Sequence, residues 1–241
     1  MTTPRRLRSL PREELADFVK ENVGQLLEDE ALDILENPYT TPAICQQIAQ
    51  NQRLTGFYSV RLELVGLKHT PQAHAVKFVH YLFWSDLVRL SVDVKVNAPV
   101  RRAIDTILVN KIDKLTLGER ITCAKRCSHA LIMALLFDPD PKVFEALLIN
   151  QRVREDDLLL IANSERATPT HLQMIADDRK WSYRYNIRKA LVMNPRTPRS
   201  AAASMLRSLT ARDLRLIHRN PRTTVYVRRC IERLQPAAYN P

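Results

Sequence analysis

Glycine is scarce in this chain: four glycines are spread over 241 residues, alongside 14 prolines and 45% hydrophobic residues. A loop that cradles phosphate needs several glycines close together, so the scattered glycines exclude the usual nucleotide-binding motifs. Few glycines also argue against a sheet protein whose strands are joined by glycine turns. Many prolines with few glycines instead favour helices that are ended by proline.

Cysteine and histidine are also few, with four and six residues. Four cysteines do not make a disulfide framework in a chain of this length. Cys123, Cys127 and His129 would offer a metal at most three ligands, so we expect small buried thiols in a helix instead. The histidines lack metal or catalytic spacing and are expected at the surface or at its boundary. The sequence therefore predicts no catalytic residues, no cofactor and no metal.

Long hydrophobic runs are missing, and the longest one, Ala130–Phe137, is far shorter than a membrane span. The N-terminal residues include arginines but no apolar stretch behind them, so a secretory signal is not expected. A membrane surface is not an expected partner either, because the basic helices lack a separate bulky apolar face. We therefore expect a soluble, cytoplasmic protein.

Acidic residues are nearly missing from the C-terminal part of the chain. Residues 171–241 hold 15 Lys and Arg, 13 of them arginine, against four Asp and Glu. In residues 1–170 the basic and acidic side chains are equal in number, so the formal net charge of +11 comes entirely from the C-terminal part. The opposite holds in Glu13–Glu36, which contains nine acids and the single base Lys20. This imbalance is larger than solubility requires and indicates a negatively charged partner.

The most distinctive sequence that is present is Asn-Pro-Arg-Thr-Pro at Asn194–Pro198, between two stretches of helical pattern. A helix does not easily continue into the residue before a proline, so we expect Asn194 to end a helix as a left-handed cap. We expect Thr197 to cap the next helix, with Pro198 at its first position, where a missing N–H has no effect. The five residues predict a tight joint between two helices.

Similar joints recur along the chain. The prolines expected to begin helices are Pro42, Pro71, Pro99, Pro141, Pro169 and Pro198, and all but one of the intervals between them are nearly equal. The one long interval, from Pro99 to Pro141, contains additional helical sequence at Thr116–Phe137. Trp84 and Trp181 give a second match, since each precedes the asparagine of its joint by the same interval. Such regularity indicates internal repeats.

Each of the equal units has room for two short helices. In one unit we expect a first helix at Pro169–Asp177 and a second helix that is capped by Ser182 and continues to Met193, with its apolar residues on one face. Short helix pairs cannot bury these faces alone, so neighbouring units must stack, with a period of about 28–29 residues. The sequence therefore predicts an all-α protein, an α-solenoid or superhelix of stacked short helix pairs. Its expected parts are an N-terminal segment with an acidic capping helix at 1–36 and a repeat array at 37–241, with an irregular longer unit around 99–140 and basic units at 169–235.

The repeat also carries a family resemblance. The pattern Thr-Pro-x2-Leu-x2-Ile-Ala-x-Asp, followed by Arg-x3-Ala-x3-Asn-Pro-x-Thr-Pro, resembles bacterial HEAT-like repeats and leucine-rich-repeat-variant proteins. It is clearest in Thr168–Arg229 and looser in Leu35–Val100, and it covers about two thirds of the chain. The resemblance is one of repeat style. It implies right-handed stacks of paired helices that mostly serve as binding surfaces, and function only by analogy.

Nine basic residues are candidates for contact with a partner. Arginine suits bidentate contact with phosphate or carboxylate better than lysine does. Several of the nine follow helical spacing, so that stacked helices would align them into a stripe, although such a series is also typical of a solvated face. The candidates are Lys180, Arg184, Arg188, Arg212, Arg215, Arg219, Arg222, Arg228 and Arg229.

Two binding functions fit these features. The preferred one is a non-enzymatic scaffold whose groove and arginines recognise an acidic protein surface, because paired-helix repeats more often serve protein partners. That surface could be the Glu13–Glu36 segment of another copy in a head-to-tail contact. The alternative is nucleic-acid binding without sequence readout, with arginines on phosphates and Tyr183, Tyr185 or Tyr226 stacked on bases.

An enzyme is the least favoured function. Helical-repeat DNA glycosylases use aromatic, acidic and arginine residues in a groove, and Trp84, Asp86 and Arg89 resemble such a set. The two tryptophans hold matching places in the repeat pattern, which instead favours a packing role for them.

Overall fold

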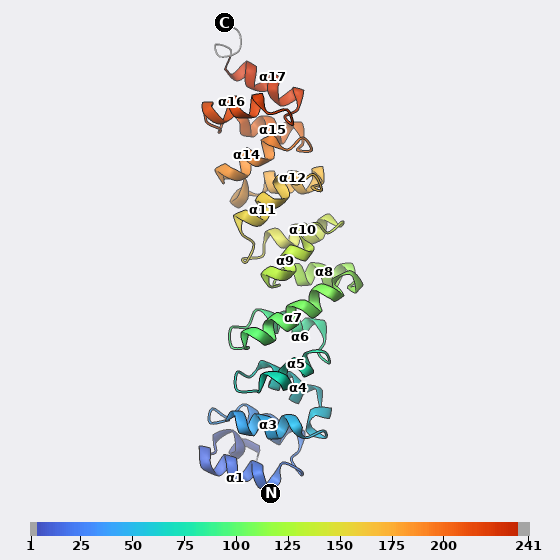
Figure 1. Ribbon diagram of the computed structural model, residues 1–241, viewed down its shortest axis with the longest axis vertical. Helices are drawn as coiled ribbons and strands as arrows, with labels where there is room; N and C mark the ends of the chain where they lie inside the picture. Colours follow the sequence, from blue (N-terminus) through green and yellow to red (C-terminus); the bar gives the residue numbers. More distant parts are fainter. Residues whose placement is uncertain (1–3, 236–241) are drawn as a thin grey trace. The chain divides into compact units, whose positions relative to one another are not determined.

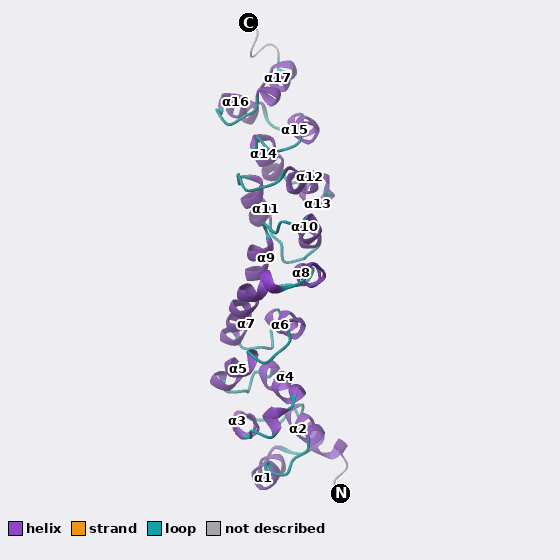
Figure 2. Ribbon diagram, turned by 90° about the vertical axis from the view of Figure 1, so that its right-hand side faces the viewer, coloured by secondary structure: helices purple, strands orange, loops and turns teal. Residues whose placement is uncertain are grey.

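The computed structural model describes residues 4–235, and all regular structure in this range is helical (Figures 1 and 2). No helix within these residues has the length and apolarity needed to cross a bilayer. The range contains 17 α-helices and three short 3-10 helices. The α-helices are Arg12–Asn22 (α1), Glu28–Leu35 (α2), Pro42–Gln50 (α3), Tyr58–Gly66 (α4), Gln72–Val79 (α5), Trp84–Ser91 (α6), Ala98–Lys111 (α7), Leu117–Ala124 (α8), His129–Leu135 (α9), Pro141–Leu148 (α10), Glu155–Ala162 (α11), Pro169–Asp177 (α12), Arg179–Ser182 (α13), Tyr185–Met193 (α14), Arg199–Leu206 (α15), Ala211–Arg219 (α16) and Val225–Leu234 (α17). The 3-10 helices are Pro4–Ser9 (η1), Leu54–Gly56 (η2) and Ile112–Lys114 (η3). The prediction of an all-α protein is confirmed.

The helices form two compact units. Unit 1 contains the chain up to Lys114 together with Arg126–Ser128, and unit 2 contains Leu115–Lys125 together with the chain from His129 onward. Within each unit, a helix packs mainly against helices that are close to it in sequence: α4 lies against α2 and α5, and α14 lies against α11 and α15. Leu64 of α4 and Leu191 of α14 are fully buried in these contacts. Each helix therefore buries its apolar face against its sequence neighbours.

Unit 2 repeats the helix pattern of unit 1. α3 begins at Pro42 and α12 at Pro169 (169 − 42 = 127), and the same offset relates α2 to α11, α4 to α14, α5 to α15, α6 to α16 and α7 to α17. A hydrogen bond recurs at this offset, because the Tyr58 hydroxyl donates to Asp86 and the Tyr185 hydroxyl donates to Asp213. We call two residues separated by this offset equivalent.

Asn194 ends α14 as predicted, but with a different geometry. Its backbone is extended (φ −78°, ψ 121°), and no residue in the range 4–235 has a positive φ. The side chain makes the cap: its amide nitrogen donates to the carbonyls of Ala162 (2.7 Å) and Ser164 (3.1 Å), and its oxygen accepts from the Arg196 N–H (2.9 Å). The predicted left-handed cap is wrong because the Asn194 side chain bonds to the preceding joint.

Thr197 also has a different partner from the one expected. Its hydroxyl donates back to the Leu191 carbonyl of the helix that has just ended (2.5 Å), and Thr40 and Thr223 make the same bond six residues back. Pro198 is the N-cap of α15 rather than its first residue. The predicted cap of the following helix is therefore wrong, and the threonine instead closes the end of the preceding one.

The prolines mark helix starts as predicted. Three begin a helix, one is the second residue of its helix and two are N-caps; in that order they are Pro42, Pro141 and Pro169, then Pro99, then Pro71 and Pro198. The long interval contains α8 and α9, which confirms the additional helical sequence there. The helix expected to be capped by Ser182 starts at Tyr185 with Arg184 as its N-cap, because Ser182 ends the separate short helix α13.

The two tryptophans occupy different places, so their predicted match is wrong. Trp84 is the first residue of α6 and is half-buried, whereas Trp181 lies in α13 and is 2% exposed. The residue equivalent to Trp181 is Leu54 in η2, which is also buried. The shared distance from an asparagine was a coincidence of two different segments.

Candidate binding surface

The short turn that leads into α14 has the same cap as the equivalent turn of unit 1, but it carries different side chains. Asp178 caps α13, since its carboxylate accepts from the N–H groups of Lys180 (2.9 Å) and Trp181 (3.2 Å). The buried Trp181 ring anchors this turn, and the Lys180 ammonium lies 4.2 Å from the centre of that ring. Tyr183, two residues later, is 81% exposed. The anchored turn therefore presents an aromatic ring and cations to solvent.

Six side chains of this turn and of α14 line an open hollow of about 770 Å³. We call it the basic hollow because four of the six are cationic. Its residues are Arg179, Lys180, Tyr183, Arg184, Tyr185 and Arg188. The structure thus brings together three of the predicted candidates, Lys180, Arg184 and Arg188.

The cations of the basic hollow are only partly neutralised by the protein. Among the described residues, Arg184 alone of the four forms an ion pair, with Glu155 of α11 at 3.6 Å. The Arg188 guanidinium lies 5.9 Å from the centre of the Tyr185 ring, and its buried Nε has no hydrogen-bond partner in the part of the chain described. The surplus of positive charge favours an anion in the hollow.

Tyr185 is fixed by contacts with α16. Its hydroxyl donates to the Asp213 carboxylate and accepts from the Thr210 N–H at 3.2 Å. The Lys189 ammonium lies 2.8 Å from Asp213, and these hydrogen bonds, from Lys189 first and Tyr185 second, hold the pKa of Asp213 below its ordinary value. The ionised Asp213 therefore holds one of the two aromatic rings of the hollow in place.

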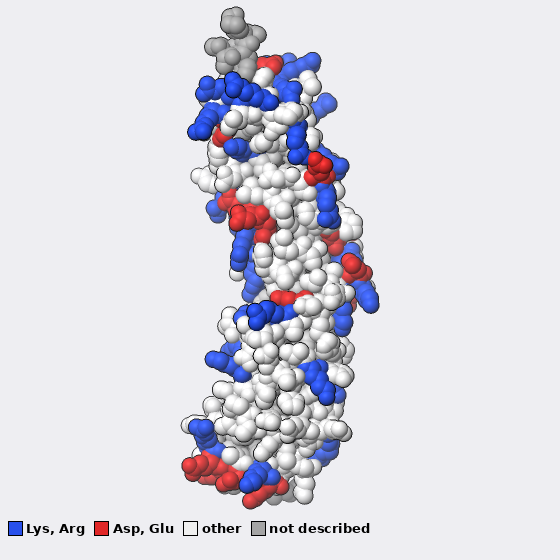
Figure 3. All heavy atoms as spheres, viewed as in Figure 1, with Lys and Arg blue, Asp and Glu red and all other residues white. Residues whose placement is uncertain are grey.

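A second basic surface lies on α16. The side chains at positions i, i+3, i+4 and i+7 of this helix are exposed, and we call them the α16 face: Arg212, Arg215, Leu216 and Arg219. Leu216 in its middle is 54% exposed. Basic side chains gather over α16 and α17 in Figure 3. None of these residues lines the basic hollow.

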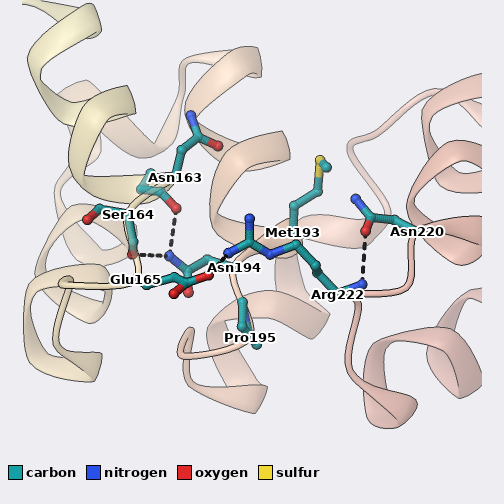
Figure 4. Close-up of a pocket in the computed structure, with 9 residues that line it drawn as sticks. Asn163, Ser164, Glu165, Met193, Asn194, Pro195, Asn220 and Arg222 are labelled. Carbon is teal, nitrogen blue, oxygen red and sulfur yellow. Dashed lines mark hydrogen bonds and ion pairs between the residues drawn. The ribbon is translucent and has the colours of Figure 1, made fainter.

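The remaining candidates lie at the joint between α16 and α17 and on α17. Arg222 forms an ion pair with Glu165 beside a small pocket of about 90 Å³ between joints of unit 2 (Figure 4). Arg228 donates to the carbonyls of Asn220 (2.9 Å) and Pro221 (3.2 Å), whereas Arg229 is exposed. The nine candidates therefore form three sets: the basic hollow, the α16 face, and this joint with α17.

Comparison with unit 1 separates two kinds of basic residue. Five candidates have a basic equivalent: Lys180 and Arg53, Arg188 and Arg61, Arg222 and Lys95, Arg228 and Arg101, and Arg229 and Arg102. The Nε atoms of both Arg228 and Arg101 are buried without a hydrogen-bond partner among the described residues, which is a shared structural environment. For this pair, the common fold explains the basic residue.

Four candidates have no basic equivalent. Arg184, Arg212, Arg215 and Arg219 are equivalent to Phe57, Ser85, Val88 and Val92. Arg179 in the basic hollow belongs with them, because its equivalent is Gln52. The common fold does not require these arginines, so they are the stronger candidates for binding.

Sequence reasoning missed Arg179 because it grouped basic residues by helical spacing, and Arg179 belongs to a separate four-residue helix before α14. The tyrosines divide differently from the expectation. Tyr183 and Tyr185 line the basic hollow, while Tyr226 lies near Arg199, whose guanidinium is 5.5 Å from its ring centre. The tyrosines of the hollow could be found from the sequence only as neighbours of the basic residues.

Asp86, one of the three residues that resemble a glycosylase set, has a structural role. Asp86 accepts from the Tyr58 hydroxyl at 2.5 Å and lies 3.4 Å from Arg89. Burial, and then the bond to Asp86, raises the pKa of Tyr58. Because the equivalent pair in unit 2 is Tyr185 with Asp213, the contact belongs to the shared fold.

Cysteines and histidines add no metal site in the range 4–235, where no group of three or more metal-ligating side chains occurs. Cys123 and Cys127 are buried, as predicted. His171 is 3% exposed, with its ring centre 4.7 Å from that of Phe144, so its predicted place at the surface or boundary is wrong. Its helical spacing from Leu172 and Ile175 puts it on the apolar face of α12.

No protein-family model, curated protein or solved structure matches this chain.

Proposed function

We propose that this protein is a non-enzymatic binding scaffold that holds an acidic segment of a protein partner in the basic hollow. The observation that carries the proposal is the clustering of four cations and two tyrosines around one open hollow. Arginines bind carboxylates through paired, charge-assisted hydrogen bonds, which are stronger than neutral ones. A segment with several Asp or Glu side chains would match this arrangement.

The scaffold we propose is a HEAT-like α-solenoid with a period of about 28–29 residues. The recurring joint supports it: Asn37, Asn150 and Asn194 each donate to a backbone carbonyl 26 to 32 residues earlier. Each bond reaches a carbonyl in or near the end of an earlier helical segment, at close to the proposed period. The match between α2–α7 and α11–α17 supports the same architecture.

Binding of a labelled acidic peptide tests the function, with fluorescence anisotropy measured over a salt series. The informative variant is Arg179→Gln with Arg184→Phe, because unit 1 has these residues at the equivalent positions, Gln52 and Phe57. Loss of two charge-assisted contacts should weaken binding by about tenfold or more. Arg102→Ala, a change of an exposed arginine in unit 1, is the matched control and should bind like the wild type. Equal binding by both variants would contradict the proposal.

Nucleic acid is the second candidate partner, and the exposed ring of Tyr183 favours it. An aromatic ring that is 81% exposed beside four cations can stack on an unpaired base while the cations contact phosphates. If this alternative holds, a single-stranded oligonucleotide binds more tightly than the acidic peptide at equal salt. Tyr183→Ala would then reduce oligonucleotide binding, whereas it should have little effect on binding of the peptide.

A further inference from the structure

The first helix of unit 1 carries an acidic surface. Leu15 and Val19 of α1 are fully buried. Its exposed acids are Glu13, Glu14, Asp17 and Glu21. We call Glu14, Asp17 and Glu21 the α1 face, because they occupy positions i, i+3 and i+7 of the helix. Acidic side chains gather over this end of unit 1 in Figure 3.

The α16 face has the same spacing with the opposite charge. Arg212, Arg215 and Arg219 also occupy positions i, i+3 and i+7 of their helix. Unlike Lys189 and Asp213, which pair between α14 and α16, none of the three has an ion pair with another described residue. Two helices with matched spacing and opposite charge can place their side chains opposite one another along about two turns.

Each face also lies on a helix at the outer side of the stacked helices of its own unit. In unit 1, α1 packs against α3, and its acids are on the exposed side. In unit 2, α14 packs against α11, and α16 contacts α14 through the hydrogen bond between Tyr185 and Asp213. The α16 face is exposed. The end helices of a repeat array are ordinarily polar so that they do not stack on other molecules. Here the polar face on α1 of unit 1 and the polar face on α16 of unit 2 are of opposite sign.

We propose that the α16 face binds the α1 face of a second copy of this chain, in a head-to-tail contact. The contact joins two different surfaces, so a copy that has bound one partner still has a free face for another. Leu216, which is 54% exposed in the middle of the α16 face, is covered when α1 docks there. The contact is separate from the basic hollow and does not rest on the function proposed for it.

The contact is held by exposed ion pairs, and such pairs are individually weak and screened by salt. Association should therefore increase with protein concentration and decrease with ionic strength. Sedimentation velocity of the full chain, over a concentration series in about 20 mM and about 300 mM salt, measures both effects. We expect species larger than a monomer at the lower salt and a return to monomer at the higher salt. A monomer at every concentration in low salt would overturn the proposal.

Charge reversal identifies the surfaces. The first variant reverses the α1 face (Glu14→Arg, Asp17→Arg, Glu21→Arg), and the second reverses the α16 face (Arg212→Glu, Arg215→Glu, Arg219→Glu). Each variant alone has two faces of the same sign and should remain a monomer. A mixture of the two should associate again, and so should a chain that carries all six changes. Failure of the mixture and of the six-fold variant to associate would overturn the pairing of these two faces.

A folding measurement and two further variants establish that any loss of association comes from the two faces. All six positions are exposed, and circular dichroism with thermal unfolding establishes that each variant is folded. A milder variant, Arg212→Ser with Arg219→Val, uses the equivalent residues of unit 1 and should also weaken association. The hollow variant Arg179→Gln with Arg184→Phe should associate like the wild type, so that failure of this proposal and failure of the proposed function are distinguishable. Binding of an acidic peptide to the α16 face without any self-association would assign the surface to a different partner.

Discussion

Single arginines in this protein have different roles although they look alike in the sequence. Arg228 donates to two backbone carbonyls at the start of its joint and has a basic equivalent in unit 1, whereas Arg184 replaces a phenylalanine and faces solvent. The environment of Arg228 belongs to the fold, whereas Arg184, although it is paired with Glu155, is exposed to a ligand. Charge alone could not separate them, because the distinction depends on backbone carbonyls that the joint brings into reach.

Truncation of Arg228 should therefore destabilise the protein. Arg228→Ala leaves the carbonyls of Asn220 and Pro221 without this donor, and we expect the free energy of unfolding to fall by about 1–2 kcal/mol. The neighbouring exposed residue provides the control, since Arg229→Ala should change stability by less than about 0.5 kcal/mol. Urea denaturation followed by circular dichroism measures both. Equal stability of the two variants would show that the Arg228 contacts contribute little.

His171 should make stability depend on pH. Burial lowers the pKa of His171 below the ordinary value of 6.5, and a hydrogen bond to the Asp138 backbone, followed by the charge of the Asp138 carboxylate, opposes this only in part. The unfolded chain takes up a proton near pH 6.5 while the folded chain does so only at lower pH, so stability is complete above this pH and falls as the pH decreases. His171→Ile introduces the residue equivalent to it, Ile44, and should remove this part of the loss. Thermal unfolding at pH 5 and pH 7.5 measures it, with the exposed His69→Ala as the variant that should keep the wild-type dependence.

At the scale of the helix and its joint, the sequence predicted positions well and bonding poorly. Proline restricts its own φ and the residue before it, so helix starts could be read from local chemistry alone. The partners of Asn194 and Thr197 could not, because the carbonyls that they bond belong to the preceding joint and the preceding helix. The residues of the basic hollow could not be fully predicted for a similar reason. Its tyrosines and Arg179 are brought together by a turn that Asp178 caps and Trp181 anchors, and helical spacing does not describe this turn.

Asn194→Ala tests the importance of the joint. The Asn194 side chain is only 8% exposed, and it donates hydrogen bonds to the carbonyls of Ala162 and Ser164. The substitution leaves both carbonyls without this donor. We expect a loss of about 1–3 kcal/mol in the free energy of unfolding. The matched control is Asn163→Ala, because the exposed Asn163 side chain bonds only within its own helix, to Leu159. Similar midpoints for the two variants in thermal denaturation would contradict a structural role for the joint.

At the scale of the whole molecule, the main feature is repetition with a change of charge. The constant offset between the units preserves helix starts, the Tyr58–Asp86 contact and several basic residues, while unit 2 gains arginines at Arg179, Arg184 and the α16 face. The all-α class could be predicted because helical periodicity and proline positions are local signals. The longer offset is harder to recognise, since most equivalent positions differ and the joints within each unit give a stronger, shorter spacing.

The charge surplus should affect stability. Residues 171–241 hold 15 basic and four acidic residues, and like charges in a folded unit repel one another more than in an extended chain. At a protein concentration low enough for the chain to be a monomer at both salts, raising the salt from about 20 mM to about 300 mM should therefore raise the unfolding temperature, because the Debye length becomes shorter than the spacing between many of these charges. Differential scanning fluorimetry measures the shift. The α16-reversed variant should gain less from salt than the wild type, and an equal gain would place the repulsion elsewhere.

The absence of positive φ values in the described range has a consequence for the few glycines of the chain. Asparagine side chains form the joints with an ordinary backbone, so no described position requires a residue without a Cβ. A Cβ added at Gly24, Gly56 or Gly118 would meet no atom within 4 Å. Each of these glycines increases the disorder of the unfolded chain without a steric need in the folded one. Replacing each by alanine should raise the free energy of unfolding by about 0.4–1 kcal/mol, so these three sites offer a simple route to a more heat-resistant form of the protein.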